Sequence, residues 1–295
     1  MKKGILLAIG SYIAWGILSI FWKYLGKIDS YEVFSYRILF TMLTMLIYFL
    51  VCGKTTKLKT ELTTLGHHKR ECISMILASI FLSINWIVYI YAMANHQATA
   101  ASLGYYINPL FSVFLAVILL KETLTSAMKC AIVLALSGVV ILAIQAGQLP
   151  VVSLLLPFTF GTYGFIKKNV NLSSDVAMFF EMLVVSPVVF SFLIFFAKHQ
   201  LTDYSVLDQG MLALSGIITA LPFLLFAEAL KLAPLNIVGF AQYLNPTIKL
   251  VIAIFLFHEP FKVENLYGFV AIWVSILVFM IGQIILLKKM RNVIK

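Results

Sequence analysis

The chain has 295 residues, of which 62% are apolar and only 12% are charged, and its mean hydropathy is +1.00. Soluble domains contain about 45–50% apolar residues, so this composition excludes a water-soluble protein and predicts a protein of the lipid bilayer. The formal net charge of +10 would suit a nucleic-acid-binding protein. In membrane proteins, however, excess lysine and arginine collect in cytoplasmic loops, so we expect no nucleic-acid partner.

Ten segments are long and apolar enough to cross a bilayer as helices, which takes about 20 residues each. In chain order, the expected spans are 4–22, 33–52, 72–92, 101–120, 129–146, 150–166, 176–197, 211–230, 236–257 and 266–287. The longest connection, 53–71, is basic and polar and is expected to be a solvated loop. The first span lacks a cleavage site of small residues, so we interpret it as a retained helix rather than a signal peptide.

The basic residues between the spans are distributed unevenly. Sixteen of the 22 lie in the terminal segments and loops of one side and four lie on the other, while Arg37 and Lys249 fall inside spans. The positive-inside rule therefore predicts that both termini are cytoplasmic, which requires an even number of spans. We expect a multi-pass protein of the cytoplasmic (inner) membrane.

The two halves of the chain share landmarks. Tyr106-x-Asn108-Pro109 recurs as Tyr243-x-Asn245-Pro246 at a shift of 137 positions, and Trp15-Gly16 corresponds to Phe160-Gly161 at a shift of 145. Chance similarity between apolar helices is the alternative explanation, but the His258-Glu259 pair also meets Lys121-Glu122 at the shift of 137. The pattern predicts an internal repeat.

A repeat with an odd number of spans must be inserted upside down in its second copy. We therefore predict an all-α polytopic fold with ten transmembrane helices, made of two inverted five-helix repeats around a central cavity. The first repeat is expected at 1–147 and the second at 148–295. This architecture is known from secondary transporters, in which the substrate binds near the midplane between the copies.

Three longer segments carry a family resemblance: KKGILLAIGSYIAWGILSIFWKYL, NWIVYIYAMANHQATAASLGYYINPLFSVFLAVILLKE and GFAQYLNPTIKLVIAIFLFHEP. They resemble the RarD subgroup of EamA-type drug/metabolite transporters, and the resemblance extends over nearly the whole chain. It implies a ten-helix inverted-repeat permease with a central cavity. Where members of that subgroup often have a histidine before the arginine of the second span, this chain has Tyr36.

Polar residues inside the spans mark a candidate substrate cavity. Gln242, Asn245 and Lys249 share one helical face of the ninth span, and the shift of 137 brings Tyr105, Asn108 and Ser112 to the same face of the fourth. Polar groups in hydrocarbon need partners or water, so two matched polar faces indicate a shared cavity. The candidate lining is completed by Trp15, Asn85, Tyr106 and Tyr243. Alternatively, the two asparagines hydrogen-bond backbone that Pro109 and Pro246 leave free.

Three charged residues inside spans are candidates for function. A lysine at mid-span costs about 2.5–3.5 kcal/mol on insertion scales, so Lys249 is expected to contact an anionic substrate group, unless it snorkels to the surface. Arg37 near the outer end of the second span and Glu181 near the inner end of the seventh could be gates or coupling groups. Equally, both could be interfacial residues that reach headgroups or pair with other helices.

These features favour a secondary transporter that moves a small metabolite or drug-like molecule, anionic or amphipathic, by alternating access. Coupling to protons or to a counter-substrate would be compatible with such a carrier. A lipid or amphiphile flippase is the closest alternative. A membrane-embedded enzyme is a distant one, because no catalytic or metal-binding motif is visible in the sequence. We expect no cofactor and no metal, and the oligomeric state stays open.

Overall fold

In the computed structural model, the described residues are 1–94, 97–145, 147, 151–258, 264 and 266–293. They form α-helices and one 3-10 turn, η1 (Leu201–Asp203), and this part of the chain contains no β-strand. The helices are α1 (Lys2–Ile17), α2 (Ser19–Leu25), α3 (Ser30–Val51), α4 (Thr55–His67), α5 (Lys69–Ala94), α6 (Ala98–Ile118), α7 (Ser126–Gln145), α8 (Val151–Lys168), α9 (Ser174–Phe195), α10 (Val206–Leu232), α11 (Leu235–Ala241), α12 (Leu244–Phe255) and α13 (Leu266–Val293).

Nine helical stretches within the described residues are long and apolar enough to cross a membrane. They coincide with nine of the expected spans, so the all-helical, multi-pass fold class is confirmed. The remaining expected span, 150–166, corresponds to α8, except for residue 150, which lies outside the described part of the chain. Helix α8 contains Pro157 and ends in Lys167 and Lys168, which lowers its hydropathy, yet it packs between α5 and α6. A total of ten spans stays a prediction.

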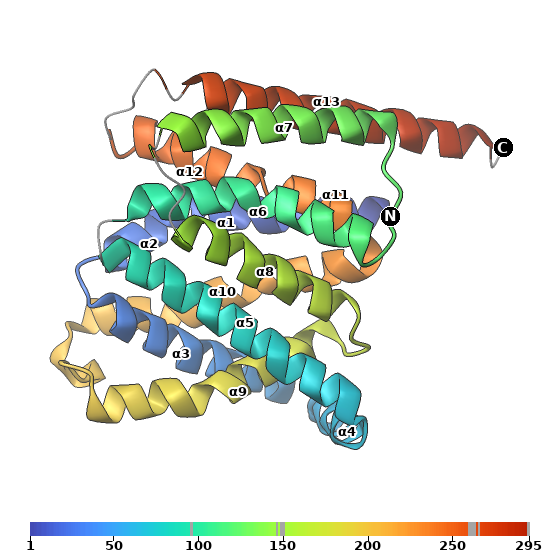
Figure 1. The fold of residues 1–295 in the computed structure, drawn as a ribbon. Helices are drawn as coiled ribbons and strands as arrows, with labels where there is room; N and C mark the ends of the chain where they lie inside the picture. Colours follow the sequence, from blue (N-terminus) through green and yellow to red (C-terminus); the bar gives the residue numbers. More distant parts are fainter. Residues whose placement is uncertain (95–96, 146, 148–150, 259–263, 265, 294–295) are drawn as a thin grey trace.

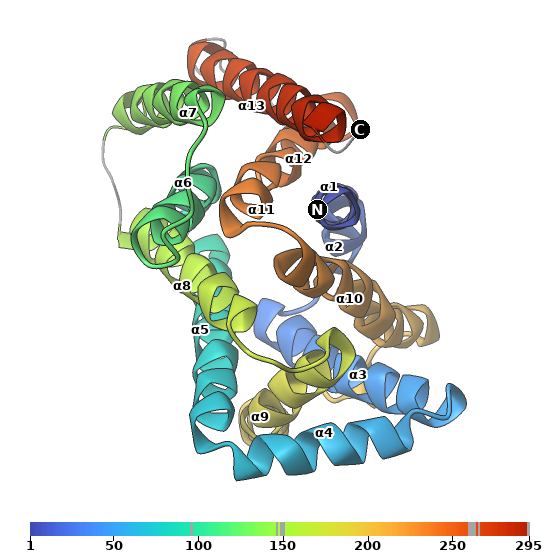
Figure 2. The same ribbon diagram turned by 90° about the vertical axis from the view of Figure 1, so that its right-hand side faces the viewer.

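The long helices lie roughly alongside one another and form one bundle (Figure 1). The N-terminus, α4 and the C-terminal end of α13 lie at one end of the bundle, which we call the termini end. The connections α2–α3 and α9–α10 lie at the opposite end, the far end. Seen from the termini end, α7 and α13 form a pair at one edge, and α3, α5 and α9 lie at the other (Figure 2).

The segment 53–71 differs from its expected form. It is a helix, α4, for most of its length rather than an irregular loop, and α5 already begins at Lys69. Leu58, Leu62 and Leu65 recur at helical spacing, and all three pack against the core, with Leu65 only 2% exposed. The apolar face of α4 lies across the termini end of the bundle, against α3, α5 and α9 (Figure 2).

Two spans are interrupted within their length. The first is divided into α1 and α2 at Leu18, and the ninth into α11 and α12 at Gln242 and Tyr243. Pro246 explains the second break, because a proline lacks the N–H that would bond to the carbonyl four residues earlier, that of Gln242, and its ring crowds that carbonyl. Both breaks lie beside the cavity described below.

Close helix contacts recur in the two halves at the shifts seen in the sequence. A Cβ on Gly16 of α1 would lie 2.7 Å from the Cβ of Ile248 on α12, and one on Gly161 of α8 would lie 2.5 Å from the Phe111 ring on α6. Gly161 follows Gly16 by 145 positions, and Ile248 follows Phe111 by 137. Each half therefore uses a glycine to let the same pair of spans approach.

A pair of hydrogen bonds follows the same correspondence. The Ser11 hydroxyl donates to the carbonyl of Pro222 at 2.8 Å, which joins α1 to α10. The Asn85 amide donates to the carbonyl of Leu156 at 2.9 Å, which joins α5 to α8. Ser11 corresponds to Leu156 at 145, and Asn85 to Pro222 at 137. These contacts support the inverted repeat, while its boundary at 147 and 148 adjoins residues outside the described part and stays a prediction.

Candidate functional site

A cavity of about 600 Å³ lies inside the bundle between α1, α2, α3, α5, α6, α10 and α12. Its lining reaches the α2–α3 connection, where Lys23, Gly26 and Ser30 are exposed. The cavity therefore opens at the far end of the bundle. Towards the termini end, the last lining residues are Tyr12 and Phe223, both buried.

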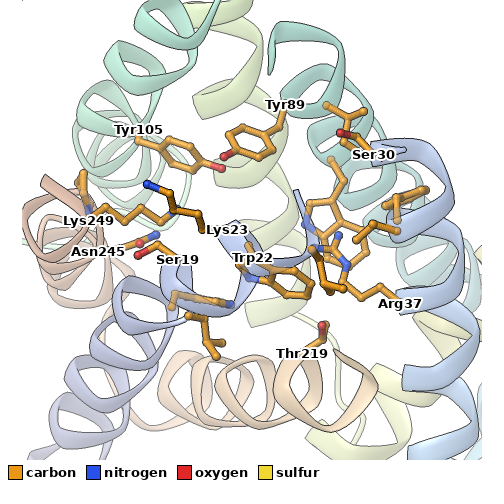
Figure 3. Close-up of a pocket in the computed structure, with 18 of the residues that line it drawn as sticks. Ser19, Trp22, Lys23, Ser30, Arg37, Tyr89, Tyr105, Thr219, Asn245 and Lys249 are labelled. Carbon is orange, nitrogen blue, oxygen red and sulfur yellow. The ribbon is translucent and has the colours of Figure 1, made fainter. Parts of the chain in front are cut away.

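The lining is strongly cationic. It contains Lys23 from α2, Arg37 from α3 and Lys249 from α12, and none of the described residues in the lining is an aspartate or a glutamate. Figure 3 shows the three side chains, with Trp22 between Lys23 and Arg37 in that view. Positive charges without nearby carboxylates create a local potential that concentrates anions. The cavity is therefore suited to an anionic ligand.

Among the described residues, the three cations contact aromatic rings rather than carboxylates. The Arg37 guanidinium lies 4.4 Å from the Trp86 ring centroid and 5.3 Å from that of Trp22. The Lys249 ammonium lies 4.7 Å from the centroid of Tyr105, and the Lys23 ammonium 3.5 Å from that of Phe257. A cation–π contact contributes about 0.5–2 kcal/mol and cancels no charge, so each cation keeps the capacity to bind an anion.

Hydrogen-bond acceptors also face this space. Asn108 of α6 and Asn245 of α12 line the cavity, and the side-chain oxygen of each has no hydrogen-bond partner among the described residues. The same holds for the hydroxyl of Thr219 on α10. A buried polar atom without a partner costs about 1–3 kcal/mol. A ligand with N–H or O–H groups would satisfy the amide oxygens and remove that cost.

Aromatic side chains close the cavity towards the termini end. The Trp15 ring lies 4.9 Å from the ring of Phe223 and 5.7 Å from that of Phe226. Phe160 of α8 packs on the same group at 6.2 Å from Trp15. Phe226 is only 1% exposed and lies outside the lining. In this conformation, these rings separate the cavity from the termini end.

Most of the predicted site residues gather at this cavity. Its lining includes Trp15, Arg37, Asn85, Tyr105, Asn108, Gln242, Asn245 and Lys249. The amide of Asn85 is also occupied in packing, because it donates to Leu156 and to the Thr159 hydroxyl, each at 2.9 Å.

Four predicted residues lie elsewhere. Tyr106 packs on Phe269 of α13, and Tyr243 packs on Phe240. Each tyrosine follows a lining residue by one position, about 100° around the helix, so its side chain turns away from the cavity. Ser112 lies behind the lining, where it accepts a hydrogen bond from Gln242 at 2.8 Å.

Glu181 is the fourth predicted residue that lies elsewhere. It is fully buried nearer the termini end and forms an ion pair with Lys167, with 2.8 Å between the charged atoms.

Several lining residues were not singled out from the sequence. Lys23 was counted among the residues between spans, whereas it is the exposed cation at the mouth of the cavity. Trp22 and Tyr89 also belong to the lining, where Trp22 contacts Arg37 and Tyr89 packs on Tyr105. The internal repeat could have identified Lys23 as a candidate, because a lysine, Lys168, occupies the corresponding position in the second half.

The comparisons with known proteins agree with this architecture. The family model described as the EamA-like transporter family matches residues 2–144 and again residues 150–281. The chain belongs to this family. A solved crystal structure has the same fold with a TM-score of 0.72 at 13% identity, over 95% of this chain and 97% of that one.

Several relatives of this EamA-family protein are named as uncharacterized transporters. It is 38% identical to the uncharacterized transporter YojE of Bacillus subtilis (strain 168), over 96% of this chain and 95% of the relative. It is 28% identical to the protein RarD of Escherichia coli (strain K12), over 96% and 95% of the two chains. The expected family is thereby confirmed. The chain is a multi-pass membrane transporter of the EamA family.

Proposed function

We propose that this EamA-family chain is a secondary transporter of small organic anions that carry hydrogen-bond donors, such as amino-acid-like carboxylates or phosphorylated metabolites. The observation that carries the proposal is the cationic lining, in which Lys23, Arg37 and Lys249 face one cavity without a carboxylate among the described lining residues. A transported anion supplies the missing charge.

The remaining lining narrows the substrate class. The side-chain oxygens of Asn108 and Asn245, which have no partner in the described part of the chain, can accept hydrogen bonds, and this favours a substrate with amino, amide or hydroxyl groups. The rings of Trp15, Trp22 and Trp86 offer apolar faces to the carbon skeleton. A volume of about 600 Å³ lies within the range of small-molecule sites.

Alternating access is part of this proposal, and a cavity that is open at one end only supports it. With the termini in the cytoplasm, as the loop charges predict, the far end faces the outside and the conformation seen here is outward-open. Transport then requires the aromatic closure around Trp15 and Phe223 to part. We propose the cytoplasmic membrane as the location, with both termini inside.

Ligand binding and flux test the proposal. Purified protein would be screened by thermal shift against pairs of metabolites that differ only in charge, each acid against its amide or ester. Hits would then be measured for flux in proteoliposomes. We expect the acids to stabilise the protein and to be transported, and their neutral partners to fail in both assays. Transport confined to neutral or amphiphilic compounds would overturn the anion proposal, and movement of lipids alone would indicate a flippase.

A further inference from the structure

An ion pair lies nearer the termini end of the bundle, outside the lining of the cavity. The Lys167 ammonium on α8 lies 2.8 and 3.0 Å from the two carboxylate oxygens of Glu181 on α9. The side chains are 4% and 0% exposed. The Tyr163 hydroxyl completes the group, since it donates to Glu181 at 3.3 Å and accepts from Lys167 at 2.9 Å.

Stability alone is a weak reason for such a group. Removing two charges from water costs several kcal/mol per ion, and apolar side chains of similar volume often stabilise a protein as well or better. Breaking the pair by removing one partner, in contrast, leaves a buried charge uncompensated. The charge of Lys167 is therefore stable in this buried position only when a carboxylate lies beside it.

The internal repeat gives this lysine a position in the transport path. At the shift of 145, Lys167 corresponds to Trp22 and Lys168 to Lys23, two residues that line the open mouth of the cavity. Glu181 corresponds to Tyr36 in the same way. In an inverted repeat, the counterpart of a mouth at the far end is a mouth at the termini end, and Lys167 lies at its edge.

That second mouth is closed in this structure. Lys168 does not face open space as Lys23 does, but donates to the backbone carbonyls of Leu230 and Ala233 at 3.0 and 2.8 Å. Lys167 is held by Glu181. The open end thus has an exposed lysine at its mouth, whereas at the closed end the two corresponding lysines, Lys167 and Lys168, are bound by groups of the protein itself.

We propose that Lys167 is a second anion-binding group of the transport path, and that the carboxylate of Glu181 occupies it while the path is closed at the termini end. The inference rests on the proposed function, because the ligand is the same class of small carboxylate. When the termini end opens, a carboxylate of the substrate takes the place of Glu181 on Lys167. Glu181 thus acts as a substitute ligand that keeps the closed state neutral.

Chemical rescue with acetate tests this exchange without a known substrate. The reporter is a cysteine at Val185, which is buried one helical turn beyond Glu181 from the termini end. It would be introduced after the native cysteines Cys52, Cys72 and Cys130 have been replaced by serine. Its reaction with a membrane-impermeant maleimide, applied to the termini end in inside-out vesicles, measures the opening of the path.

We expect Glu181→Ala to raise the labelling rate at least about tenfold. The free-energy cost of leaving one charge of a buried pair without its partner is larger than the free energy that corresponds to a tenfold change in an equilibrium. Acetate should then fill the vacated position and return the rate towards the reference value, and acetamide should not. In the double variant with Lys167→Met, acetate should have no effect. Glu181→Gln, which keeps the shape, should also raise the rate if Glu181→Ala is poorly folded.

Two results would overturn the inference. An unchanged labelling rate in both Glu181 variants would show that the pair does not hold the termini end closed. Opening without rescue by acetate, or rescue that persists without Lys167, would show that the lysine is no anion site. Neither result depends on flux, so a failure here is distinct from a failure to transport anions through the cavity.

Discussion

The ammonium group of Lys249 lies 4.7 Å from the centroid of the Tyr105 ring, so a charged group on α12 faces an aromatic ring on α6 inside the cavity. The two residues come from different halves of the chain. The contact orients the lysine without neutralising its charge, so the lysine can still bind an anion. The first prediction concerns this lysine.

Replacing Lys249 by methionine should reduce the flux of an anionic substrate by roughly ten- to a hundredfold, because a hydrogen bond to a charged group contributes about 1.5–3 kcal/mol. Lys249→Arg should retain more activity, since it keeps the charge. The control is Lys129→Met, which removes an exposed lysine from α7, away from the lining. Flux of the acid and of its amide would be compared in proteoliposomes. Unchanged preference for the acid in Lys249→Met would place this lysine outside the substrate site.

Leucine at Asn108 or Asn245 should impair transport without destabilising the protein. The amide oxygen of each lacks a partner among the described residues, so its loss removes no hydrogen bond to that atom and relieves a cost of about 1–3 kcal/mol. We expect an unchanged or higher thermal midpoint together with a loss of flux. Val251→Leu on α12 and Ile118→Leu on α6 are lipid-facing controls in the same spans. A lower midpoint with full flux would make the asparagines structural, as partners of backbone near Pro109 and Pro246.

Much of the fold could be predicted from the sequence because the bilayer imposes a simple rule. A run of about 20 apolar residues predicts a membrane-spanning helix. The helical period of 3.6 residues then identifies the face that carries Gln242, Asn245 and Lys249. The face of a neighbouring residue is harder to predict. Tyr106 and Tyr243 lie one position from the lining and turn towards Phe269 and Phe240, which depends on how each helix is rotated in the bundle.

Contacts between distant elements could not be predicted. For Glu181 the sequence leaves two interfacial environments open, lipid headgroups or a pair with another helix, and the structure shows a pair with Lys167, fourteen positions earlier and on another helix. Lys167 is one of the sixteen basic residues that the sequence places in loops and terminal segments, so nothing in the sequence marks it as that partner. The leucine spacing in 53–71 was visible in the sequence, but the high share of polar residues favoured a loop over the helix α4 that forms there.

The close contact of α1 with α12 gives a prediction about stability. Gly16→Ala should destabilise the protein by about 1–3 kcal/mol, the usual cost of overpacking, because the new Cβ would lie 2.7 Å from Ile248. Gly10→Ala on the same helix is the matched control, since its Cβ would meet its nearest neighbour, Leu225, at 3.9 Å. Thermal midpoints in detergent would be compared. Equal midpoints for the two variants would show that α1 and α12 can separate freely at this point.

The orientation of the bundle is the prediction on which the direction of opening depends. In a chain without native cysteines, single cysteines at Lys59 on α4 and at His199 in the α9–α10 connection occupy exposed positions at opposite ends. With the termini inside, an impermeant maleimide added to intact cells should label the His199 variant at once and the Lys59 variant only after the membrane is permeabilised. Labelling of both variants after lysis controls for intrinsic reactivity. The reverse pattern would place α4 and the N-terminus outside. The cavity would then open to the cytoplasm, and the closure around Lys167 and Glu181 would be the outer one.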